Sequence, residues 1–304
     1  MRMNRDAVLG VLASVGVVLL FSGFLVVSRF GATSTLTIYD MAALRFGIAG
    51  VCTIPIFFLV RWPRIPLWKA AVIAITSGAP FTLFVFGGMS FAPVAHGGIV
   101  INGAMPVFAS LLAWAVFGVR LSGWRIVGVL MIVAGVIGTG WDALSFGEPG
   151  QWRGHLLFLG AAACNATFLT SVRGWGLTAL QSLICVNGIN LLIYIPIWLL
   201  LLPSNLAGTP WPEILLQGVY QGVVAAFIAS ILIAHAARML GGMRQAAAMS
   251  AAPAVAVLIA IPALGESPSG ISVAGICVVM AGILVALGPG LLSGVASPQA
   301  TPRS

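Results

Sequence analysis

The sequence predicts an all-α integral membrane protein with ten transmembrane helices, built as two inverted five-helix repeats around a central cavity. Composition predicts the membrane class, because 60% of the residues are hydrophobic and only 7% are charged, whereas soluble domains carry roughly a quarter charged residues. An internal duplication predicts the repeats. The four cysteines lie inside apolar runs without a CxxC pair, so we expect no disulfide framework, no metal site and no cofactor.

The duplication is clearest between residues 102–138 and the segment 147 residues further along. An apolar segment, a proline, a glycine turn and a second apolar segment recur in that order. The matched pairs are Pro106/Pro253, Gly118/Gly265, Gly123/Gly270, Gly128/Gly275 and Gly135/Gly282. Glycines about seven residues apart lie on one helix face, where a neighbouring helix approaches closely. We therefore predict that the fifth and tenth spans are peripheral and pack through glycine stripes.

Ten apolar segments approach the roughly 20 residues that a membrane span needs. Charges, tryptophans and Pro/Gly clusters delimit them at residues 7–28, 38–60, 68–91, 94–117, 123–141, 153–173, 178–202, 213–238, 243–265 and 270–290. We expect residues 1–147 to form the first repeat, residues 148–292 the second, inverted repeat, and residues 293–304 a disordered cytoplasmic tail. Five spans in each half force the second half to enter the membrane upside down.

Charge predicts the orientation. With the N-terminus in the cytoplasm, eleven of the fourteen basic residues fall on the cytoplasmic side, which is the bias expected of an inner-membrane protein. Those residues are Arg2, Arg5, Arg61, Arg64, Lys69, Arg120, Arg125, Arg173, Arg238, Arg244 and Arg303. This pattern accounts for the net charge of +8 without a nucleic-acid partner. We expect both termini in the cytoplasm and the lipid bilayer as the surrounding partner.

Polar residues inside the spans mark the predicted cavity, since they cost free energy unless they face protein or water. Arg45 lies about two helical turns below the outer surface, and a guanidinium suits a carboxylate; snorkelling to the headgroups is the alternative. Asp40, about 140° further round the helix, is not its expected partner. The predicted substrate-binding set is Arg45, Asn102, Asn165, Asn190, Tyr220 and Gln221; the alternative role for each asparagine is interhelical hydrogen bonding.

Two further sets concern motion and coupling. Pro80, Pro106 and Pro253 lie near mid-span, where a proline frees a carbonyl and permits a hinge or a static kink. The sequence places no Asp or Glu near the middle of a span, which disfavours a carboxylate proton relay. His96 and His235 are the candidate coupling residues, because imidazole titrates near neutrality. Facilitated movement down a gradient is therefore the favoured mode.

The two copies of the frame, Pro, apolar run, Gly turn and Gly-x₄-Gly-x₆-Gly, resemble the EamA-type repeat of the drug/metabolite transporter superfamily, ten-helix branch. Leu44-Arg45-Phe46 is similar to the early arginine of that repeat. One departure is that Gly265-Glu266 keeps the usual Gly-Glu, whereas the first half has Gly118-Val119. The resemblance implies export of amino acids or related small metabolites from a bacterial cytoplasm across the inner membrane. The inverted repeats favour alternating access as the mechanism.

Other functions remain as alternatives. The same architecture suits an exporter of other metabolites, drugs or nucleotide sugars with proton coupling. An intramembrane enzyme is disfavoured because the sequence lacks HExxH and Gly-x-Gly-Asp motifs, and we expect no catalytic residues. The single lysine, Lys69, follows Trp68 and belongs to no P-loop, so nucleotide hydrolysis is not expected.

Overall fold

The computed structural model describes residues 5–59, 65–118 and 122–288, and these ranges form helices joined by short turns. Ten segments of the described chain are long and apolar enough to cross a membrane. They are Val8–Ala32, Ile38–Phe58, Leu67–Phe91, Val94–Val116, Gly123–Ser145, Gln151–Gly174, Ala179–Leu201, Trp211–Leu240, Gly242–Leu264 and Gly270–Leu287. The chain is thus a multi-pass membrane protein, and the prediction of ten spans is confirmed. The predicted tail, residues 293–304, lies outside the described residues.

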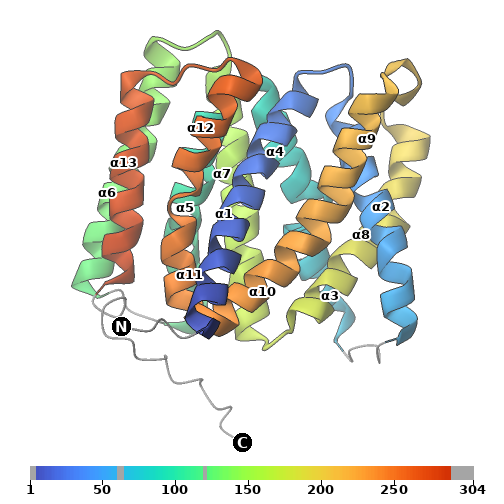
Figure 1. The fold of residues 1–304 in the computed structure, drawn as a ribbon, viewed down its shortest axis with the longest axis horizontal. Helices are drawn as coiled ribbons and strands as arrows, with labels where there is room; N and C mark the ends of the chain where they lie inside the picture. Colours follow the sequence, from blue (N-terminus) through green and yellow to red (C-terminus); the bar gives the residue numbers. More distant parts are fainter. Residues whose placement is uncertain (1–4, 60–64, 119–121, 289–304) are drawn as a thin grey trace, which may run out of the picture.

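The individual elements are α1 (Arg5–Ala32), α2 (Ile38–Leu59), α3 (Leu67–Thr76), α4 (Ala79–Phe91), α5 (Val94–Phe117), α6 (Gly123–Ser145), α7 (Gln151–Gly174), α8 (Ala179–Leu201), η1 (Leu206–Gly208), α9 (Trp211–Val219), η2 (Tyr220–Ile228), α10 (Ala229–Leu240), α11 (Gly242–Met249), α12 (Ala252–Leu264) and α13 (Gly270–Leu287). Element η1 is a 3₁₀ turn, and η2 is a π-helix inside the eighth span. Successive spans run in opposite directions, so α1 begins and α13 ends at the lower face in Figure 1. We call the opposite end the upper face.

Two spans are interrupted where the sequence predicted kinks at prolines. The third span breaks between α3 and α4, and the ninth breaks between α11 and α12. Pro80 and Pro253 each lie in the first turn of the half-helix after the break. In the first turn a backbone amide has no hydrogen-bond partner within the helix, so a proline there costs no helical hydrogen bond. Pro106, in contrast, lies inside the continuous helix α5. Pro80 and Pro253 therefore lie at the starts of helices and do not bend a continuous helix.

Asn190 of α8 bridges the break in the third span. Its Oδ1 accepts a hydrogen bond from the amide of Ala79, at the start of α4, at 2.9 Å. Its Nδ2 donates to the carbonyl of Ala74, at the end of α3, at 3.0 Å. Both backbone groups are orphaned by the interruption, and an unpaired backbone group inside a bilayer is costly. One side chain thus satisfies both ends of the break.

Helices α6 and α13 pack against each other at one side of the bundle (Figure 1). A Cβ added at Gly128 would meet the Gly282 carbonyl oxygen at 2.6 Å, and one added at Gly135 would meet the Gly275 carbonyl oxygen at 3.1 Å. The glycines therefore let the two backbones approach, as predicted. The 147-residue offset turns the Gly128–Gly282 contact into the Gly275–Gly135 contact. The contacts are thus reciprocal between the two halves of the chain.

Helix α1 runs through the rest of the bundle and contacts α4, α5, α10 and α12. Its buried Phe24 belongs to a core that also includes Phe46 of α2, Phe86 of α4 and Phe158 of α7. Because this core joins helices from both halves of the chain, it holds the polar side chains of α1, α2 and η2 in fixed relative positions.

Candidate functional site

Arg45 lies half-buried among helices α1, α2 and η2. Its Nη1 donates a hydrogen bond to Oε1 of Gln221 at 3.1 Å. Its guanidinium carbon lies 5.4 Å from the centre of the Phe24 ring and 6.0 Å from that of Phe46. Within the described chain, no carboxylate lies within 4.0 Å of this guanidinium. Among the described residues, the arginine therefore has aromatic and amide neighbours but no balancing negative charge.

Asp40 has other partners, as the helical geometry predicted. Its carboxylate accepts hydrogen bonds from Thr37 Oγ1 at 2.8 Å, Trp198 Nε1 at 3.0 Å and the Asn205 amide at 2.9 Å. These bonds fasten the first turn of α2 to α8 and to the loop that follows it. Asp40 is therefore fully engaged in structural hydrogen bonds away from Arg45.

Gln221 belongs to an amide cluster on the eighth span. Its Nε2 donates to Ser28 Oγ at 3.2 Å and to Gln217 Oε1 at 3.4 Å, and Gln217 donates to the Val27 carbonyl of α1. Gln221 and Gln217 are fully buried. The π-helical segment η2 begins at Tyr220, and π-helical turns are frequent at functional sites. Tyr220 itself donates to the Leu20 carbonyl at 3.0 Å.

Of the six residues predicted to bind substrate, only Arg45 and Gln221 contact each other directly, while Tyr220 is next to Gln221 in the chain. The side chain of Asn190 hydrogen-bonds the two backbone groups at the break in the third span. Asn102 of α5 donates to the Gly98 carbonyl of its own helix. Asn165 of α7 is half-exposed, and none of the described groups hydrogen-bonds to it. The structure thus supports one compact polar group, Arg45, Gln221, Gln217 and Ser28, with Asn102 and Asn165 on other helices.

A second polar group ties helix ends together at the upper face. Arg29, in the last turn of α1, forms an ion pair of 2.8 Å through its Nε with Oε1 of Glu266, in the loop between α12 and α13. Its Nη1 donates to the carbonyl of Met89. Glu266 Oε2 accepts from the Val94 amide, at the start of α5, at 2.8 Å. The ends of α1, α4, α5 and α12 are therefore linked through one carboxylate.

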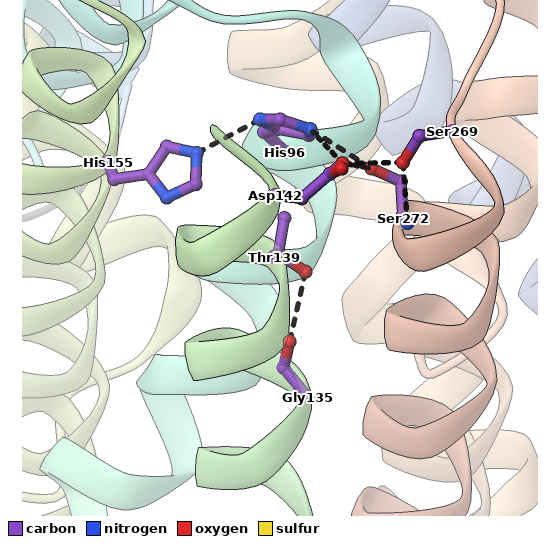
Figure 2. A network of polar contacts seen from close by, with 7 residues as sticks. All are labelled: His96, Gly135, Thr139, Asp142, His155, Ser269 and Ser272. Carbon is purple, nitrogen blue, oxygen red and sulfur yellow. Dashed lines mark hydrogen bonds and ion pairs between the residues drawn. The ribbon is translucent and has the colours of Figure 1, made fainter. Parts of the chain in front are cut away.

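A third polar group surrounds His96 of α5, near the upper end of the bundle. Figure 2 shows His155 pointing at one edge of the His96 ring, with Asp142, Ser269 and Ser272 at the other. Sequence reasoning named His96 but missed its partners. Asp142 lies inside α6 and is 5% exposed, whereas the expected span ended at residue 141. His235 lies on α10, far along the chain from this group, and contacts Arg238.

Two pockets open at the ends of the described structure. One, of about 180 Å³, is lined by His96, Asp142, Glu266, Ser269 and Ser272 at the upper face. The other, of about 310 Å³, lies between α8 and α10 and is lined by Leu180, Ser230, His235 and Arg238. The two candidate coupling histidines thus line different pockets.

Comparison with known proteins found a family match over part of the chain. Residues 8–141 match the EamA-like transporter family. The matched segment is just under half of the chain and runs from α1 into α6. One solved structure, titled "Crystal structure of protein", is similar with a TM-score of 0.59 and 21% identity, over 91% of this chain and 96% of that one. This likeness concerns the fold alone. No curated protein matches the chain.

Proposed function

We propose that this protein is a secondary transporter that exports amino acids or related small metabolites across a bacterial inner membrane by facilitated alternating access. The observation that carries the proposal is the Arg45 guanidinium, which lies among helices from both halves of the chain without a carboxylate partner in the described residues. A lone charge inside a membrane domain is costly unless a ligand or water uses it. The match of residues 8–141 to a transporter family supports the same conclusion.

The chemistry of the Arg45 group favours a solute with a carboxylate. A guanidinium presents a fork of N–H donors that matches a carboxylate in two-point contact. Amide oxygens of Gln217 and Gln221 lie on the adjoining helix and accept hydrogen bonds, as the ammonium group of an amino acid requires. A zwitterion is therefore complementary to the group, whereas a neutral sugar leaves the charge unbalanced.

The inverted repeat is the second part of the proposal. The reciprocal Gly128–Gly282 and Gly135–Gly275 contacts support a two-fold relation between residues 1–147 and 148–292. Under that relation, Arg29 at the upper face corresponds to Arg173 at the lower end of α7. Arg173 is exposed and forms no ion pair with any described residue, and the first half has Val119 in the sequence position of Glu266. We infer a resting state closed at the upper face by Arg29 and Glu266.

The test is competition in proteoliposomes that exchange a radiolabelled amino acid. An unlabelled amino acid should compete, whereas its carboxamide should not, because Arg45 recognises the carboxylate. Arg45→Gln should lose at least tenfold in exchange rate, since a charge-assisted bidentate contact contributes about 1.5–3 kcal/mol. Arg125→Gln, at an exposed position of α6, is the matched control. Equal exchange by Arg45→Gln and Arg125→Gln would remove Arg45 from the site.

A further inference from the structure

Two histidines from different helices contact each other directly inside the bundle. Nε2 of His155 on α7 lies 3.0 Å from Nδ1 of His96 on α5. The rings are nearly perpendicular, and their centres are 5.0 Å apart. The side of His96 that faces away from His155 points at Ser272 of α13 and Asp142 of α6 (Figure 2). Four helices therefore meet at one imidazole.

The hydrogen bonds fix which nitrogen carries each proton. Ser272 Oγ has one proton and donates it to Asp142 Oδ2 at 3.0 Å, so it accepts from His96 Nε2–H at 3.0 Å. A neutral His96 then has a bare Nδ1, which accepts from His155 Nε2–H. The hydrogen bonds thus all run in one direction: His155 donates to His96, His96 donates to Ser272, and Ser272 donates to the Asp142 carboxylate. Ser269 Oγ donates to the same carboxylate oxygen at 2.5 Å.

This arrangement has room for one additional proton. A proton added to His155 Nδ1 allows the Nε2 proton of His155 to pass along the existing hydrogen bond to His96 Nδ1. His96 is then an imidazolium with both nitrogens protonated, while His155 is neutral and its Nε2 accepts. Every added or transferred proton ends on a ring nitrogen, and neither imidazole ring needs to rotate. A second proton would leave two N–H groups facing each other and two like charges in contact, which is strongly unfavourable.

The surrounding charges favour that single imidazolium. Asp142 Oδ2 lies 3.7 Å from His96 Nε2 and supplies the nearest negative charge. Glu266 lines the same pocket, but Arg29 and the Val94 amide already engage its two oxygens. On α7, Arg153 is exposed and lies over the Trp152 ring. Among the described residues of α4, α12 and α13, no titratable side chain forms a hydrogen bond or ion pair with either histidine ring.

We propose that His96, His155 and Asp142 form a binding site for one proton beside the upper-face pocket, which His96 and Asp142 line, and that its occupancy changes the rate of transport. The proton reverses the direction of the only side-chain hydrogen bond between the His96 and His155 rings, and α5 and α7 belong to opposite halves of the chain. Occupancy therefore alters a contact between the two halves of the chain. Alternating access moves these halves relative to each other. The second step rests on the proposed transport function; the proton site does not.

Nitrogen NMR of histidine tests the site without any transported solute. The chain has three histidines, and ¹⁵N-labelled imidazole distinguishes both neutral tautomers from the imidazolium. In lipid bilayers between about pH 4 and pH 9, a range that spans ordinary imidazole titration, His96 and His155 should together gain one proton, and His155 should exchange its Nε2–H tautomer for Nδ1–H. His235 is the internal control. Two independent one-proton transitions, or no change in either ring while His235 titrates, would overturn the site.

Variants separate the site from general unfolding. Asp142→Asn removes the counter-charge and keeps a hydrogen-bond acceptor, so the charged fraction of His96 at a given pH should fall. His155→Gln should leave His96 without the shared proton, and His235→Gln should leave the pair unchanged. A His96 titration identical in wild type and His155→Gln would contradict the shared site even where all variants fold.

The transport consequence has its own readout. Exchange of a radiolabelled amino acid should change several-fold across the pH interval in which NMR shows the pair gaining its proton, both in wild type and in His235→Gln. The profile should flatten in His155→Gln. A flat wild-type profile beside a confirmed NMR transition would overturn the link to transport. Absence of amino-acid exchange at every pH would instead count against the proposed function, and the NMR result would stand alone.

Discussion

Replacing Glu266 with glutamine tests the closure of the upper face. The carboxylate accepts from Arg29 Nε and from the Val94 amide, each at 2.8 Å. Glutamine has one acceptor oxygen, so one of the two donors meets an NH₂ group, and the charge of Arg29 loses its partner. The two side chains are 21% and 17% exposed, which is intermediate between a surface pair and a buried one.

The magnitude follows from that intermediate exposure. Exposed ion pairs contribute about 0.2–1 kcal/mol and hydrogen bonds to charged groups about 1.5–3 kcal/mol. A loss of about 1.4 kcal/mol lies between these values and corresponds to a tenfold change in an equilibrium constant. If the bonds exist only when the upper face is closed, Glu266→Gln should raise the open fraction about tenfold.

Thiol labelling measures that fraction. Ser28 is fully buried and lies one residue before Arg29 on α1, so Ser28→Cys in a background free of the four native cysteines reports opening. A charged methanethiosulfonate should modify it about tenfold faster in the Glu266→Gln variant. Glu213→Gln is the matched control, because within the described residues Glu213 makes a single 3.4 Å contact, with Thr35. Equal labelling rates in the parent, the Glu266 variant and the Glu213 variant would refute the closure.

Two further substitutions test the packing that supports the site. Gly128→Ala should lower the stability in detergent by about 1–3 kcal/mol, a usual cost of overpacking, because the new Cβ meets the α13 backbone at 2.5–2.6 Å. Gly138→Ala, on the same helix with open space around it, should not; equal melting temperatures would contradict the close packing of α6 on α13. Asn190→Ala should cost about 2–6 kcal/mol, since two backbone groups lose their partner and each costs about 1–3 kcal/mol; a melting temperature unchanged from wild type would show that the break does not depend on Asn190.

Hydropathy predicted the ten spans because each carries enough apolar residues to cross a bilayer and the connections are short. The glycine stripes were also predictable, since a seven-residue spacing fixes the helix face whatever the partner is. The separation of Asp40 from Arg45 followed from the same helical geometry, and the structure gives each residue a different partner.

The partners of His96 were not predictable in the same way. The predicted fifth span ended at Trp141 and so left Asp142 in a loop, whereas α6 continues to Ser145. His155 lies near the start of the sixth span, and no sequence pattern singled it out. Contacts between α5, α6, α7 and α13 depend on how the helices are rotated and tilted, and periodicity within one helix carries no such information. The role of Asn190 in the third span was hidden for the same reason.

Under the proposed function, the protein should carry amino acids without an imposed proton gradient. Purified protein in proteoliposomes preloaded with an unlabelled amino acid should accumulate the same radiolabelled amino acid by counterflow, at equal pH on both sides. Unlabelled competitors should block the accumulation, and protein-free liposomes should show none. Absence of counterflow for every amino acid tested, with folding confirmed by an unchanged melting transition, would contradict the account.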